Sequence, residues 1–181
     1  MLTVTGCNTD AVGKLTVDVY VPFNFGVEPW RPDEVITWYH RDNSRNALEF
    51  RIDSDTGDLS AVTLVMSDRP IEDAPELPCH LLPTTPGLPV FASGAVDGRV
   101  FEQRRDFSIL RANNDFGILW SGWSRATDCM GLDRISFLLA ETAIVGVFFL
   151  QLTDAEMETV EMWDKFRQPT PQVSRGETHS D

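Results

Sequence analysis

The most constraining feature of this sequence is a pair of apolar runs whose hydrophobic residues fall at every second position. These positions are Leu48, Phe50 and Ile52 in residues 47–53, and Val62, Leu64 and Met66 in residues 59–66. A period of two residues is that of a strand with one buried face. Because a short polar stretch containing Gly57 joins the two runs, we expect an antiparallel hairpin.

A second pair of runs repeats this pattern later in the chain. Residues 134–140 and 143–152 are strongly apolar and are joined around Glu141 and Thr142, which predicts another hairpin. Strands are also predicted at 14–21, 34–40, 106–112 and 116–123. Each hairpin follows an aromatic-bearing strand, with Trp38 in the first case and Trp120 in the second. We therefore expect two similar β-meanders, and a possible duplication of residues 14–66 as residues 106–152.

The regions between these runs are rich in proline. Residues 22–34 hold three prolines, which favours a loop, and we expect Phe23, Phe25 and Trp30 to pack back onto the body of the protein. Residues 67–100 are also rich in proline but keep apolar side chains. We expect this stretch to be an ordered connector that lies over a core.

The segment after residue 152 predicts a helix. Thr153 and Glu156 have the spacing of a capping box, in which each side chain binds a free amide of the first turn. One face is expected to be apolar and to pack on the sheets, with Ala155, Thr159, Met162, Trp163 and Phe166. The opposite face is expected to be acidic, with Asp154, Glu158, Glu161 and Asp164, and with Lys165 among them.

Together these elements predict an α+β fold that is mostly antiparallel β, with two similar β-meanders in one sheet system and a C-terminal helix packed on it. A length of 181 residues suits one domain, which we place at residues 1–166. Residues 167–181 are polar and are expected to form a disordered tail.

Net charge narrows the range of partners. The chain carries 28 acidic and 15 basic residues, for a formal net charge of −13. Such a surface repels phosphate backbones, which disfavours direct nucleic-acid binding, and it speeds encounter with a basic protein. Solubility alone is the other explanation of the charge. The candidate partner-binding residues are Trp30, Asp154, Glu158, Glu161 and Asp164.

The stretch IDSDTGDLSAVTLV, residues 52–65, has two possible interpretations. Asp53, Asp55 and Asp58 resemble the carboxylates of a calcium loop. In such a loop glycine stands at the sixth position and glutamate at the twelfth. Here Gly57 is the fifth residue counted from Asp53, and the flanking runs are strands. The alternative, a tight turn, needs the same Asp, Ser and Gly residues, and we favour it.

No catalytic or metal site is expected. The three cysteines and three histidines do not stand at ligand spacing, and SGWS (121–124) lacks the final glycine of a serine elbow. No cofactor is predicted. Three widely spaced cysteines, no visible signal segment and no apolar run long enough for a bilayer favour a cytoplasmic protein without membrane contact.

The passage ALEFRIDSDTGDLSAVTLV resembles a hairpin found in small immunity proteins that bacteria carry against polymorphic or contact-dependent toxins. The resemblance covers this hairpin and its second copy. It implies tight binding to a toxin, often a basic nuclease, through an acidic surface.

Three functions are consistent with these sequence features. The first is an acidic protein-binding module or immunity protein with a basic partner. The second is a small-molecule-binding β domain with aromatic residues around a pocket between the meanders. The third is an enzyme that uses a pair of carboxylates.

Overall fold

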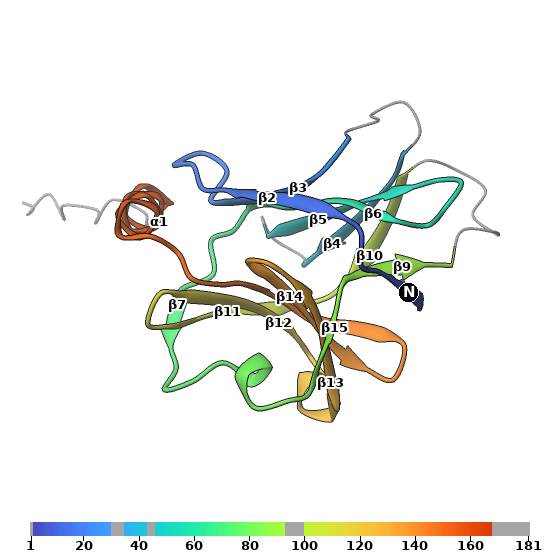
Figure 1. The fold of residues 1–181 in the computed structure, drawn as a ribbon. Helices are drawn as coiled ribbons and strands as arrows, with labels where there is room; N and C mark the ends of the chain where they lie inside the picture. The colour runs from blue at the N-terminus through green and yellow to red at the C-terminus, as the bar shows by residue number, and fades with distance from the viewer. Residues whose placement is uncertain (1, 30–34, 43–45, 93–99, 168–181) are drawn as a thin grey trace, which may run out of the picture.

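The described residues form a β-sandwich with one α-helix. The computed structural model describes residues 2–29, 35–42, 46–92 and 100–167, and Figure 1 shows the two main sheets facing each other with the helix beside them. Trp30 lies outside the described residues, as do most of the predicted tail and parts of both proline-rich segments.

The strands form three sheets, of which two are large. The first, in the order β10-β4-β5-β6-β3-β2, contains β2 (Val12–Thr16), β3 (Phe23–Glu28), β4 (Val35–Arg41), β5 (Ala47–Asp53), β6 (Leu59–Met66) and β10 (Val100–Arg104). The second, in the order β7-β11-β12-β15-β14-β13-β8, contains β7 (Ile71–Asp73), β8 (Thr84–Pro86), β11 (Phe107–Ala112), β12 (Asp115–Trp120), β13 (Asp128–Leu132), β14 (Ile135–Ala140) and β15 (Ala143–Phe149). A third, small sheet pairs β1 (Val4–Asn8) with β9 (Leu88–Phe91), and the helix α1 spans Asp154–Arg167.

Most neighbouring strands are antiparallel; β10, β7 and β8 pair in parallel with β4, β11 and β13. The predicted α+β, mostly antiparallel fold with a C-terminal helix packed on it is therefore confirmed. The two predicted hairpins, β5–β6 and β14–β15, are both present.

Five consecutive strands follow the same order in each large sheet. Strands β2 to β6 are arranged as 4-5-6-3-2, and strands β11 to β15 as 13-14-15-12-11. The two predicted hairpins thus hold equivalent places in the two sheets. The equivalence of the strands with Trp38 and Trp120 is wrong, because β4 corresponds to β13, and Trp120 lies on β12, which corresponds to β3. A duplication of the chain stays a prediction.

Several strands differ from the sequence-based expectation: β1, β10, β13 and the short strands β7, β8 and β9 were not predicted, and β3 and β2 differ in instructive ways. Residues 23–28, predicted as part of a loop, form strand β3, which lies between β2 and β6 and whose Phe23 and Phe25 are fully buried. Prolines on both sides hide this short alternation of apolar and polar residues. Strand β2 ends at Thr16, although residues 17–21 continue its alternation; the chain turns there, where Asp18 accepts a hydrogen bond from the amide of Tyr20 at 2.8 Å.

The main core lies between the two large sheets. Phe23 stacks on Phe149 with ring centroids 4.6 Å apart, and it contacts Phe116 at 5.2 Å. Val160 and Trp163 of α1 belong to the same cluster of buried side chains. The aromatic side chains expected around a pocket between the meanders therefore fill the space between the sheets.

The proline-rich connector covers the outer face of the seven-stranded sheet. Its Leu77 and Cys79, the latter in a short 3-10 helix at Pro78–His80, are buried with Leu138 and Phe148 in a second apolar cluster. The outer face of the six-stranded sheet carries no comparable apolar cluster among the described residues.

The stretch at residues 53–58 is the turn of the β5–β6 hairpin. A carboxylate oxygen of Asp53 accepts hydrogen bonds from the amides of Asp55 and Thr56 at 2.9 and 2.8 Å. Gly57 has a φ of 78°, and its carbonyl accepts a hydrogen bond from the amide of Phe91 at 2.8 Å. These contacts confirm the interpretation as a tight turn, in which the carboxylate satisfies backbone donors.

Replacing Gly57 tests how firmly this turn sets the hairpin. A Cβ at Gly57 would lie 2.1 Å from the carbonyl oxygen of Phe91, on a backbone that side chains rarely adopt. We expect Gly57→Ala to lower the free energy of unfolding by more than about 1 kcal/mol in urea denaturation. Gly26→Ala is the control, because a Cβ there meets nothing within 4 Å. Equal unfolding midpoints for the two variants would contradict this role of Gly57.

Candidate interaction surface on helix α1

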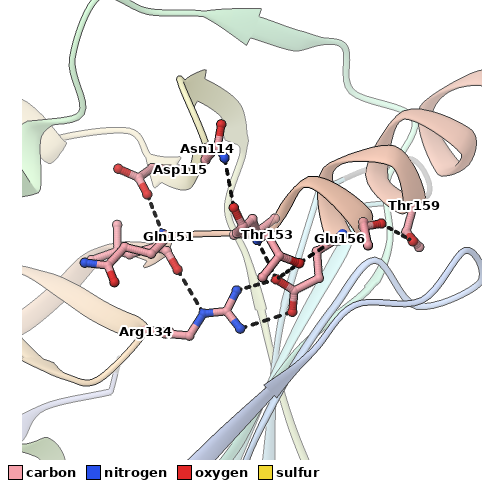
Figure 2. A network of polar contacts seen from close by, with 10 residues as sticks. Asn114, Asp115, Arg134, Gln151, Thr153, Glu156 and Thr159 are labelled. Atoms are coloured by element: carbon pink, nitrogen blue, oxygen red, sulfur yellow. Dashed lines mark hydrogen bonds and ion pairs between the residues drawn. The ribbon is translucent and has the colours of Figure 1, made fainter.

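Helix α1 begins with a reciprocal cap. The amide of Thr153 donates to the Glu156 carboxylate at 2.8 Å, and the amide of Glu156 donates to the Thr153 hydroxyl at 3.3 Å (Figure 2). The predicted capping box is therefore confirmed. Leu152 is buried in the main core and Met157 packs against it, as a hydrophobic staple requires.

An ion pair joins this cap to the seven-stranded sheet. Arg134, in the turn between β13 and β14, binds both carboxylate oxygens of Glu156, at 3.1 and 2.5 Å, and its Nε donates to the carbonyl of Leu150 at 3.2 Å (Figure 2). The hydrogen bonds from Arg134 lower the pKa of Glu156, with a further contribution from the Thr153 cap. The first turn of the helix is thus fixed to the body of the protein.

The last turn of α1 is fixed by Arg167. Its guanidinium donates to the carbonyl oxygens of Ser67 and Arg69, which follow strand β6. It also pairs with Asp164 and lies over the Trp163 ring, 4.3 Å from the centroid. The helix therefore spans from the β13–β14 turn to the end of β6 and touches both large sheets.

These anchors determine which face of α1 is buried. Val160 and Trp163 point into the core, between the anchoring residues Glu156 and Arg167. The predicted apolar face is correct for Trp163 and wrong for Ala155, Met162 and Phe166, which are exposed. The ion pairs rotate the helix away from the orientation that apolar content alone predicts.

The outward face of α1 combines acidic and apolar side chains. We define it as Asp154, Glu158, Glu161, Met162 and Phe166. All five are exposed, with 47% of Met162 and 79% of Phe166 accessible to solvent. Four of them stand at intervals of four residues, so they follow one another along a single line of the helix.

Three of the four predicted acidic residues of the helix lie on this face. The exception is Asp164, which is half-buried in its ion pair with Arg167. Asp164 therefore contributes to the anchoring of the helix end, and its role in binding a partner stays a prediction. The predicted contact residue Trp30 lies outside the described residues. The sequence pattern did not reveal Met162 and Phe166 as surface residues, because their apolar character favoured burial.

A second acidic region lies at the β5–β6 turn. A hollow of about 300 Å³ there is lined by the acidic side chains of Asp10, Glu28, Asp53 and Asp58. Asp53 and Asp58 are engaged by the turn and by Asn8, whose amide donates to Asp58 at 3.0 Å. Among the described residues, no three His, Cys, Asp or Glu side chains are placed to hold a metal ion together.

His40 is buried between the sheets and packs on Trp120, with ring centroids 5.0 Å apart. Burial, with the nearby positive charge of Arg105, lowers the pKa of His40 to about 3. The imidazole is therefore neutral at pH 7, and its position within a closed core makes it a structural residue.

Comparison with known protein families and with curated proteins found no match to this chain. Within the described residues, no helix has the length and apolar content needed to cross a bilayer.

Removal of the Glu156 side chain tests the cap. Glu156→Ala deletes both the capping contacts and the partner of Arg134, so we expect the free energy of unfolding to fall by about 1–3 kcal/mol. The exposed neighbour Glu158→Ala serves as the control and should change it by less than about 0.5 kcal/mol. Because the folded pKa of Glu156 is lowered, its stabilisation is present above the unfolded pKa and is lost as pH falls through the folded pKa. Similar urea midpoints for both variants would contradict this account.

The free energy of unfolding at acidic pH tests the protonation state of His40 in the folded protein. Its folded pKa of about 3 lies below its unfolded value near 6.5, so its stabilisation is complete above about pH 6.5 and is lost as pH falls toward 3. We expect the difference in unfolding free energy between the wild type and His40→Phe to change by about 1.4 kcal/mol per pH unit in this range. Urea denaturation at several pH values measures it. Parallel pH curves, or titration of the His40 imidazole itself near pH 6.5 in the folded protein, would contradict the prediction.

Proposed function

We propose that this chain is a protein-binding inhibitor that uses its acidic surface to bind a basic protein. The observation that carries the proposal is the outward face of α1, where the exposed apolar side chains of Met162 and Phe166 continue a line begun by Asp154 and Glu158. Large exposed apolar side chains beside charges are typical of contact surfaces, where aromatic residues supply most of the binding energy.

The way α1 is held also supports the proposal. A helix fixed at both ends, by Arg134 and by Arg167, presents its outward face without the loss of conformational entropy that a mobile segment would suffer on binding. The net charge of −13 adds a long-range attraction to a basic partner.

We further propose that the chain is a bacterial immunity protein that acts in the cytoplasm and neutralises a basic toxin by direct contact. The resemblance of the β5–β6 hairpin to such proteins supports this specific role. The alternative of an apolar ligand between the meanders is less well supported, since Phe23, Phe116 and Phe149 pack together there. For a carboxylate-dependent enzyme, Asp53 is a poor candidate because it caps the β5–β6 turn.

Charge reversal on α1 tests the proposal. The products of the genes that flank the coding sequence are purified, and their binding to the chain is measured by calorimetry and stopped-flow at low and high salt. We expect a basic product to bind, with an association rate that falls as salt is raised. Reversal of Asp154, Glu158 and Glu161 to Lys should slow association, whereas the same change at the exposed Asp10, Glu28 and Asp55 should have a smaller effect.

The apolar part is tested separately. Phe166→Ser should weaken binding at least about tenfold through a faster dissociation rate and leave the unfolding midpoint unchanged, since Phe166 is 79% exposed. Leu81→Ser, at another exposed apolar residue, is the matched control and should bind as the wild type does. Binding that is independent of salt, or equal affinity of the Phe166 and Leu81 variants, would contradict the proposed surface.

A further inference from the structure

A groove of about 610 Å³ crosses the outer face of the six-stranded sheet, on the side away from the main core. Two side chains of the β2–β3 loop, Asp18 and Val21, line one part of it, and Glu49 and Arg51 of β5 line another. The remaining lining residues come from β2, β3 and β6 and are Thr16, Asn24, Gly26, Ala61, Thr63 and Val65. Its volume lies within the range of about 300–1,000 Å³ that is typical of small-molecule sites.

The groove is hollow because two small residues stand next to each other across the sheet. Gly26 of β3 pairs with Ala61 of β6, and Arg51 of β5 pairs with Ala61 on its other side. A Cβ built at Gly26 would meet nothing within 4 Å. Glycine inside a strand weakens the sheet, and it often marks a place where another molecule comes close to the backbone.

A row of uncharged polar side chains borders this hollow. The hydroxyl of Thr63 donates to the side-chain oxygen of Asn24 at 2.8 Å, and the hydroxyl of Thr16 donates to the Asn24 carbonyl at 3.1 Å. Hydroxyl and amide groups can each donate and accept hydrogen bonds. The amide of Asn24 also donates to the Thr16 hydroxyl at 3.4 Å. The groups left for a ligand are therefore the remaining lone pairs of the two hydroxyls and the second amide hydrogen of Asn24, which match a ligand that can both donate and accept.

The charged groups of the groove largely neutralise one another. Glu49 is only 5% exposed, and its carboxylate accepts hydrogen bonds from Arg51 and from the Tyr39 hydroxyl. A carboxylate this buried on the outer face of a sheet is retained at a desolvation cost. Its pairing with Arg51 leaves the centre of the groove without the strong negative field that the net charge of the chain would suggest.

We propose that this groove binds a neutral polyhydroxylated ligand, a mono- or disaccharide or the matching unit of a polysaccharide. The row of Thr16, Asn24 and Thr63 would bind its hydroxyl groups, and the small apolar floor at Gly26 and Ala61 would contact its carbon-bound hydrogens. Asp18 disfavours an anion, and because Glu49 is paired with Arg51, Asp18 is the only carboxylate of the lining left to attract a cation. This site lies on a different part of the molecule from α1 and is independent of the protein-binding function.

The test is a saccharide panel measured by saturation-transfer NMR and calorimetry on the full chain. The probes are glucose, galactose, mannose, N-acetylglucosamine, maltose, cellobiose and the polysaccharide dextran, with sodium phosphate and spermidine as charged comparisons. We expect at least one saccharide to bind with a Kd below about 10 mM and both charged probes to bind more weakly. Tighter binding per site to dextran than to the free sugars would indicate that the ligand is a unit of a polysaccharide. Equal or weaker binding to dextran would indicate that the ligand is a free sugar.

Substitution at Gly26 separates binding from folding. Gly26→Val fills the hollow without a clash at the Cβ, so the variant should fold with an unchanged or higher unfolding midpoint and lose at least tenfold in saccharide affinity. Thr63→Val removes one hydroxyl of the row and should also weaken binding, while Phe166→Ser on α1 should not. Failure of every saccharide to bind, preferential binding of phosphate or spermidine, or full affinity in Gly26→Val would overturn the proposal.

Discussion

The structure depends on the burial of two sheet faces against each other. Each large sheet has an apolar inner face. Phe23 of the six-stranded sheet stacks on Phe149 of the seven-stranded sheet, so the two inner faces are in contact. Apolar burial of this kind is the largest favourable contribution to folding, but it leaves two outer faces and the open ends of the sandwich. The remaining segments of the chain differ in which of these surfaces they cover and which they leave exposed.

The two outer faces and the end of the sandwich beside α1 differ in how they are covered. The connector with Leu77 covers the outer face of the seven-stranded sheet. Helix α1 adds Trp163 to the main core. The outer face of the six-stranded sheet is lined instead by polar groups such as Asn24 and by the small residue Gly26. A polar face needs no cover to be stable in water, so this sheet can offer a groove at its surface.

Polar contacts at both ends of helix α1 fix which of its faces is exposed. The anchors at Glu156 and Arg167 fix which residues meet the core, and they place Phe166 in solvent. Leaving an aromatic ring exposed gives no folding benefit, since it could have been buried in a helix of another orientation. The proposed contact with a partner would use both the exposed ring and the acidic residues beside it.

Much of the fold was predictable from local patterns in the sequence. The alternation in residues 47–53 and the Thr153–Glu156 spacing each reflect a contact between residues close in the chain, and both predictions are confirmed. Strand β3 was not predictable in this way, because its burial between β2 and β6 overrides the prolines around it. The buried face of α1 depends on Arg134, a partner 22 residues away from Glu156.

The groove could not be predicted from local sequence patterns either, because it depends on contacts between residues far apart in the chain. Its floor exists only because β3 and β6, far apart in sequence, place Gly26 opposite Ala61. Register between distant strands is set by the packing of the whole core, which a single sequence does not state. The groove, and the exposure of Met162 and Phe166 on α1, were therefore visible only in the assembled structure.

The most direct test of the central claim is hydrogen–deuterium exchange of the chain alone and in complex with the basic protein that the proposed function requires. The account predicts new protection concentrated in residues 154–167, because the outward face of α1 forms the centre of the contact. Protection confined to the β5–β6 turn or to the six-stranded sheet, with exchange in α1 unchanged, would contradict it.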